Sequence, residues 1–129
     1  MNIPGNLKYS ESNEWINLQG NIGTIGISDY AQDQLSDIVF AEVIVNEGDQ
    51  IKKGDSIATV ESVKAAADVY TPISGKVINV NDALGGSPEV INTDPYGMAW
   101  IIKIEPNNLA EVSDLMDAQA YEKLIQEAK

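Results

Sequence analysis

The 129-residue sequence predicts a mainly β protein, a flattened β-barrel or sandwich with a short internal helix and a C-terminal helical tail. Three observations predict this class. Apolar residues alternate with polar or small residues in several short segments, as they do in half-buried strands. Turns that contain glycine, such as Gly48-Asp49 and Gly54-Asp55, separate these segments. After Pro106 the apolar residues instead recur every three or four positions, which is the spacing of a helix.

The first two strands are expected near the N-terminus. Residues 14–18 alternate polar and apolar side chains, and residues 22–27 repeat that period of two after a Gly20-Asn21 turn. The second segment is expected to place its isoleucines on one face and its small residues on the other, so that another chain segment packs closely against the small residues. Ser28-Asp29 is typical of a helix start, and it predicts a short helix that ends near residues 36–37.

The middle of the chain is expected to supply the remaining strands. Runs of β-branched and aromatic residues predict them at residues 38–45, 56–60, 68–70, 75–80 and 100–104. Residues 42–57 can also be aligned with residues 76–91, because Val43, Ile44 and Ile57 then coincide with a valine and two isoleucines. This faint repeat suggests two similar strand–turn–strand units with approximate two-fold symmetry.

The C-terminal part is expected to be helical. Its apolar residues recur at helical spacing, and either Ser113 or Asp117 is expected to cap the helix. We therefore expect a single domain over residues 1–129, with a β core at about 14–104 and a C-terminal helical segment at about 107–129.

Composition excludes several classes of function. Acidic residues outnumber basic residues by 20 to 8, which gives a formal charge of −12, and all eight basic residues are lysine. Binding to nucleic acid or to an anionic membrane is therefore not expected. Without histidine or cysteine, the chain has no Ser-His-Asp or Cys-His nucleophile, no zinc site of the usual kind and no disulfide. It lacks the pattern of a signal peptide and any apolar run long enough to cross a bilayer, so we expect a cytoplasmic protein.

The segment between the two units contains the candidate functional residue. One strand is expected to arrive at Glu61 and the next to leave near Asp68, which places Lys64 at the tip of a hairpin. Three alanines follow Lys64, so no bulky neighbour on that side would cover its amine. Periodicity alone favours an ordinary solvated lysine at this position.

The residues around this lysine resemble the attachment site of the glycine cleavage H-protein family, whose members carry a lipoyl group. Glu61-Ser62-Val63-Lys64-Ala65 is similar to the attachment sequence of that family. Biotin carriers usually have methionine on both sides of their lysine, and lipoyl domains of 2-oxoacid dehydrogenases more often read Asp-Lys-Ala. The resemblance extends over nearly the whole chain, in segments at residues 7–9, 13–15, 26–35, 37–40, 72–77, 80–81, 92–97 and 100–104.

The resemblance implies a fold of the lipoyl/biotinyl-carrier type, a barrel-sandwich hybrid, with lipoic acid attached covalently as N6-lipoyllysine at Lys64. It implies a non-catalytic carrier of the aminomethyl group in glycine cleavage. The partners would be the PLP-dependent P protein (glycine decarboxylase), the folate-dependent T protein (aminomethyltransferase), the L protein (dihydrolipoyl dehydrogenase) and lipoyl-attaching enzymes; a monomer is expected. Glu14 and Asp68 are, by resemblance, the carboxylates expected to contact the loaded arm.

The sequence departs from the family pattern at three places. Asn13 stands where the family commonly has histidine, Ser36 where it commonly has glycine, and Met98-Ala99 where a pair that contains glycine is usual. If the glycine at position 36 needs a positive φ, Ser36 is strained. These departures put partner contacts and loop geometry in doubt and leave the attachment at Lys64 untouched.

Three other interpretations remain open. The same lysine would also serve a relay that passes octanoyl or lipoyl groups to other carriers in lipoate metabolism. The acidic residues would also suit a small hydrolase that uses a Glu/Asp pair, although no pair stands in a recognisable setting. The third is a purely structural β-sandwich. Intact mass after growth with lipoate separates the two carrier interpretations from the other two.

Overall fold

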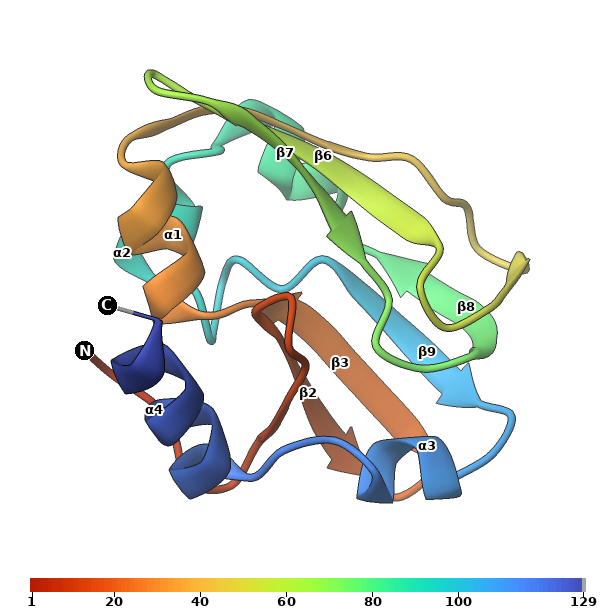
Figure 1. The fold of residues 1–129 in the computed structure, drawn as a ribbon. Helices are drawn as coiled ribbons and strands as arrows, with labels where there is room; N and C mark the ends of the chain where they lie inside the picture. The colour runs from red at the N-terminus through yellow and green to blue at the C-terminus, as the bar shows by residue number, and fades with distance from the viewer. Residues whose placement is uncertain (129) are drawn as a thin grey trace.

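The structure, a computed structural model, describes residues 1–128 and is built on two antiparallel sheets (Figure 1). The nine strands are β1 (Lys8–Tyr9), β2 (Glu14–Gln19), β3 (Ile22–Ile27), β4 (Ile38–Val43), β5 (Gln50–Ile51), β6 (Ser56–Ser62), β7 (Ala66–Tyr70), β8 (Gly75–Val80) and β9 (Ile102–Pro106). The helical segments are α1 (Asp29–Leu35), the 3₁₀ turn η1 (Asp82–Gly86), α2 (Val90–Thr93), α3 (Ala110–Ser113) and α4 (Ala118–Glu127). The predicted mainly β class is confirmed. Over the described residues the sheets stay separate, so the fold is a barrel-sandwich hybrid without a closed barrel.

The larger sheet has six strands in the order β1-β2-β3-β9-β8-β5. Its β2–β3 hairpin pairs from Glu14 opposite Ile27 to Gln19 opposite Ile22, and Gly20 turns the chain with φ of 64°. The predicted grouping of the isoleucines in β3 is wrong for one residue. Ile22 is exposed while Ile25 and Ile27 are buried, because positions 22 and 25 lie on opposite faces of a strand.

The small residues of β3 confirm the expected close approach of another segment. A Cβ on Gly26 would lie 2.7 Å from Cζ2 of Trp15 on the neighbouring strand β2. The Trp15 indole is fixed there because its N–H donates to the carbonyls of Ile27 at 3.0 Å and Pro95 at 3.1 Å. Residue 15 is thus held rigidly beside Glu14.

The smaller sheet has the order β4-β6-β7, so β4 and β7 are its edge strands. β6 and β7 form the predicted hairpin, which projects beside the segment that leaves α1 (Figure 1). In β4 the register shifts between Ile38 and Phe40, which places a β-bulge at the end nearest the hairpin tip.

Two helices confirm the sequence prediction. The Ser28 hydroxyl caps α1 by accepting from the Ala31 N–H at 3.1 Å. Asp117 caps α4 in the same way, with 2.8 Å from the Ala120 N–H to its carboxylate, whereas Ser113 ends α3 instead.

The sequence did not predict the short helix α2, and the helical segment expected at about 107–129 is divided into α3 and α4. Ile91 lies in α2, so the second unit of the proposed repeat does not continue as a strand there and the repeat is wrong over that part. Lys129, the last residue of the expected C-terminal segment, lies outside the described residues.

Most apolar side chains of both sheets form one buried core, and a second cluster joins α4 to β1 and β2. In this second cluster the rings of Tyr9 and Tyr121 stack at 4.6 Å with an interplanar angle of 2°. None of the helices within residues 1–128 is long and apolar enough to cross a membrane.

Candidate functional site

Lys64 lies at the exposed tip of the β6–β7 hairpin, as the sequence predicts. Ser62 closes the tip: its N–H donates to the Ala65 carbonyl at 2.7 Å, and its hydroxyl accepts from the N–H groups of Lys64 at 3.1 Å and Ala65 at 2.9 Å. These bonds satisfy the backbone of a turn that contains no glycine. The lysine is therefore presented by a defined turn rather than by a loose loop.

The turn between α1 and β4 supports the hairpin tip. The Val63 N–H donates to the Asp37 carbonyl at 3.0 Å, and the Lys64 Nζ lies 3.4 Å from the Gln34 carbonyl at the end of α1. Asn92 in α2 fixes this turn in place, since its amide accepts from the Ile38 N–H at 2.8 Å and donates to the Ser36 carbonyl at 2.9 Å. Three segments that are distant in the sequence thus hold the lysine.

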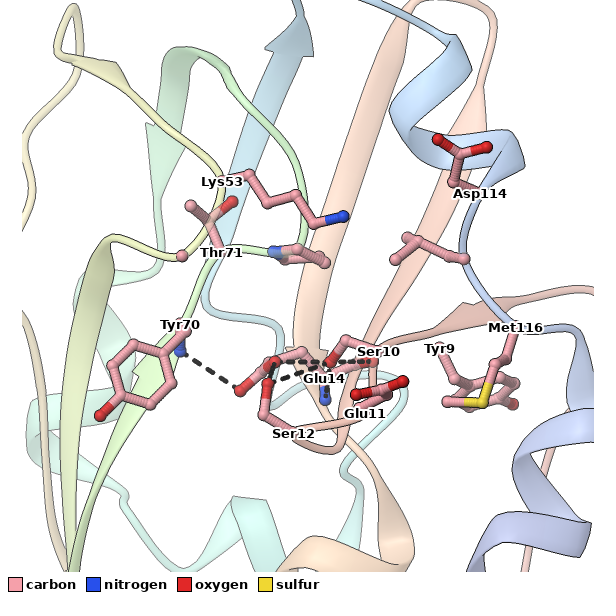
Figure 2. A pocket seen from close by; sticks show the side chains of 13 residues that line it. Tyr9, Ser10, Glu11, Ser12, Glu14, Lys53, Tyr70, Thr71, Asp114 and Met116 are labelled. Carbon is pink, nitrogen blue, oxygen red and sulfur yellow. Dashed lines mark hydrogen bonds between the residues drawn. The ribbon is translucent and has the colours of Figure 1, made fainter.

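Glu14, the second candidate residue, is buried at the start of β2 with an exposed fraction of 2%. Its Oε1 accepts from the hydroxyls of Ser10 and Ser12, each at 2.6 Å, and its Oε2 accepts from the Tyr70 backbone N–H at 3.2 Å (Figure 2). The sequence alone allowed an ordinary exposed strand carboxylate. The structure instead has a buried carboxylate that accepts hydrogen bonds from three donors.

Burial raises the pKa of the Glu14 carboxyl above its ordinary value of 4.5, because a charged carboxylate is poorly solvated there. The hydrogen bonds from Ser10, Ser12 and the Tyr70 N–H lower the pKa in the opposite sense, but burial is the larger effect. A buried carboxylate of this kind binds a cation favourably, because the cation compensates the negative charge that water does not solvate there.

Two pockets meet at Glu14. The proximal pocket, of about 190 Å³, runs between α1 and β7 and is lined by residues that include Gln34, Ala67 and Asp68. The distal pocket, of about 540 Å³, lies beyond Glu14, where Figure 2 shows Lys53 and Asp114 on its walls. Ser12 and Glu14 line both pockets. Because Gln34 also contacts Lys64, the proximal pocket leads from the attachment tip to the buried carboxylate.

One wall of the proximal pocket is the open edge of β7. The backbone hydrogen bond from Ser62 to Ala65 fixes which residues of β7 hydrogen-bond to β6 and which point the other way, because the two kinds alternate along an antiparallel pair. That alternation turns the N–H and C=O groups of Ala66, Asp68 and Tyr70 away from β6 and toward the edge. Glu14 accepts the Tyr70 N–H on this side, and Asp68, whose backbone also points to the edge, lines the pocket.

Asp68, the third candidate residue, is exposed and lines the proximal pocket together with Glu14. The structure thus brings Lys64, Asp68 and Glu14 along one path, in that order. The two serines and the Tyr70 backbone N–H were missed by the sequence reasoning. The two serines that closely precede Glu14 were the only available signal, and the Tyr70 contact spans 56 residues.

Two departures from the family pattern occupy unusual backbone conformations. Asn13 has φ of 75° and Ser36 has φ of 70°, and both flank the site. Asn13 accepts a hydrogen bond from the Tyr121 hydroxyl at 2.8 Å, which ties α4 to the loop before Glu14. Ser36 confirms the expected positive φ. Among residues 1–128, no group of three or more acidic side chains is placed to hold a metal ion.

Comparison with known proteins identifies the family of the chain. The family described as "Glycine cleavage H-protein" matches residues 7–128 of the chain. The glycine cleavage system H protein of Carboxydothermus hydrogenoformans is 53% identical over 125 residues, which covers 97% of this chain and 95% of that protein. The one of Symbiobacterium thermophilum is 50% identical over 126 residues, covering 98% of each. A crystal structure of a glycine cleavage system H protein from Mycobacterium marinum superimposes with a TM-score of 0.86 at 32% identity, covering 96% of this chain and 99% of that one.

Proposed function

Because the chain belongs to the glycine cleavage H-protein family, we propose that Lys64 carries a lipoyl group in amide linkage and that the protein uses it to carry the aminomethyl group of glycine cleavage. The observation that carries this proposal is the path from the exposed amine of Lys64 to the buried carboxylate of Glu14. No cysteine is needed in the chain, because the bound group supplies the sulfur chemistry.

The proximal pocket fits such a group. Asp68 follows Lys64 by four residues, or roughly 13 Å along an extended strand. A lipoyl-lysine side chain reaches roughly 14 Å from its Cα, as standard bond lengths give. The apolar part of the pocket, with Leu35, Val60 and Ala67, suits the hydrocarbon part of the arm. The backbone groups of Asp68 that point to the sheet edge suit its amide.

Glu14 and Asp68 hold the cargo end in this proposal. An aminomethyl group is a cation at neutral pH, and the ionised Glu14 would accept its N–H groups in a site with little water. Ser10 and Ser12 keep the Glu14 carboxylate in place by donating to Oε1, and Oε2, which accepts only the Tyr70 N–H, has a further lone pair for the cargo. Asp68 adds negative charge at the entrance, where solvent screens it more strongly.

The chain itself makes and breaks no bond in this scheme. We infer that it presents the arm as a monomer to the PLP-dependent decarboxylase, the folate-dependent aminomethyltransferase and the dihydrolipoyl dehydrogenase, after lipoyl-attaching enzymes have acylated Lys64. Tethering raises the concentration of the arm at each of these sites. The net charge of −12 favours encounter with basic partner surfaces, so association is expected to weaken with salt.

The test is the modification of Lys64. Wild-type protein, Lys64→Arg and the matched control Lys52→Arg are each incubated with lipoate, ATP and a lipoate-attaching enzyme, and intact mass is measured. We expect one lipoyl increment on the wild type and the control and none on Lys64→Arg. A lipoyl increment that persists on Lys64→Arg, or its absence from the wild type, would overturn the proposal. Circular dichroism checks that all three proteins are folded.

A further inference from the structure

An exposed apolar patch borders the attachment tip. Val63, next to Lys64 in the chain, is 69% exposed, and Val39 and Phe40 at the start of β4 are 57% and 42% exposed. We call these three residues the tip patch. Lone exposed apolar residues are common on protein surfaces, but a cluster beside a functional residue calls for a physical cause.

The cause of this exposure is the bulge in β4. In a regular strand, Val39 and Phe40 would face opposite sides, and one of them would join the core. The register shift lets both stand opposite the single partner Glu61, so both side chains are solvent-exposed while their neighbours Ile38 and Ala41 are buried. Bulges are frequent beside functional sites because they re-aim side chains in this way.

The tip patch is continuous with Lys64. Phe40 pairs across from Glu61, three residues before the lysine, and the Val63 N–H is bound to the Asp37 carbonyl two residues before Val39. The backbone under the patch is fixed by these bonds, so the apolar surface is presented with little loss of entropy on binding.

Carboxylates surround the tip patch. Asp37, Glu42 and Glu61 are exposed around it. Lys64 is the only basic residue between Lys53 and Lys76, and its charge disappears on acylation. A partner that fits this surface has an apolar socket with a basic rim.

We propose that the tip patch is the docking surface for the enzyme that acylates Lys64, an inference that rests on the function proposed above. The distance from the hairpin backbone to the atom that reacts points to this partner rather than to the enzymes that act on the finished arm. The amine of an extended lysine lies roughly 6 Å from its Cα, so an enzyme that bonds to it must cover the hairpin tip itself. Enzymes that act on the far end of a finished arm, roughly 14 Å out, need less contact there.

The reaction at this surface is an acyl transfer. The lone pair of the Lys64 Nζ attacks the carbonyl carbon of an activated acyl donor, an acyl adenylate or a thioester. The new C–N bond replaces the bond from that carbon to the leaving oxygen or sulfur, which departs with its electron pair, and the nitrogen gives up one proton. The patch takes no part in these bonds and acts by holding the lysine in the partner's site.

The experiment compares two sets of exposed substitutions. The patch variant is Val39→Thr/Phe40→Thr/Val63→Thr, and the matched control is Met98→Thr/Leu109→Thr, whose two side chains are 69% and 52% exposed. The kcat/KM for lipoylation is measured by intact mass with a purified lipoate-attaching enzyme. We expect a fall of at least about tenfold for the patch variant, through KM, and less than about twofold for the control.

A second measurement separates docking from later steps. Both variants are driven to complete lipoylation by long incubation and then assayed as substrates of glycine decarboxylase and dihydrolipoyl dehydrogenase, where we expect rates within about twofold of the wild type. Normal lipoylation of the patch variant would overturn this inference, and so would a loss confined to the later assays. If the wild type took no lipoyl group at all, the proposed function itself would fail.

Discussion

Ser36 offers a direct test of the backbone that supports Lys64. Its φ of 70° and ψ of −154° lie in a region that is populated almost entirely by glycine. The chain is held there from both sides: the Ser36 N–H donates to the Gln32 carbonyl at 3.0 Å, and the Ser36 carbonyl accepts from Asn92 at 2.9 Å. Because the side chain is exposed, replacing it by glycine removes strain without removing buried contacts.

We expect Ser36→Gly to stabilise the protein by about 1 kcal/mol. A side chain in this region costs about 1–3 kcal/mol of stability, which the substitution would recover. About 0.5–1 kcal/mol of this gain is lost again, because glycine gives the unfolded chain more conformational freedom. For a chain of this size the net gain corresponds to a rise in Tm of about 4 °C.

The assay is urea unfolding followed by tryptophan fluorescence, with Asn13→Gly as the contrast. Asn13 also has a positive φ, but asparagine tolerates this conformation and its side chain accepts the Tyr121 hydroxyl. We therefore expect Asn13→Gly to lower the free energy of unfolding by about 0.5–1 kcal/mol, the net value of such a hydrogen bond. If Ser36→Gly were neutral or destabilising, the assignment of strain to this turn would be refuted.

Two further predictions concern the charge of Glu14 and the packing against Trp15. Burial raises the Glu14 pKa, and only the ionised carboxylate pairs with a cation, so the half-life of the loaded arm should shorten as the pH falls through that raised pKa. Glu14→Gln should abolish this dependence; a pH profile identical to the wild type would contradict the role. Gly26→Ala should cost about 1–3 kcal/mol in urea unfolding, since the new methyl meets the fixed Trp15 indole. Gly23→Ala meets the flexible end of a side chain and should cost less; equal costs would refute this reasoning.

The sequence predicted the features that depend on short-range signals. The α1 boundaries follow from the Ser28 cap, and the position of Lys64 follows from a hairpin whose two strands are adjacent in the chain. The burial of Glu14 depends instead on the approach of β7, 56 residues away, and no local pattern reports such a contact. The short helix α2 was missed because four residues carry too little helical periodicity, and Asn92 in it holds the turn beside the lysine.

The division into two sheets was likewise beyond local reasoning. β9 joins β3 to β8, and this order depends on long-range pairing between Ile25 and Ile102 and between Val77 and Ile104. The bulge at Val39 and Phe40 leaves no sequence signal except three large apolar residues in succession, Ile38 to Phe40, which a buried strand would also show. Exposure of both residues became evident only when the register was known.

The uncovered side of β7 has a consequence for the behaviour of the protein in concentrated solution. A sheet rim with free backbone groups invites a strand from a second molecule, and such additions start aggregates. On the proposed function, an arm bound in the proximal pocket would block this rim only part of the time, because it must leave the pocket to reach each partner. Asp68 within the strand and the strongly negative surface repel an approaching copy during those intervals. We therefore expect the acidic surface to limit self-association at this accessible edge.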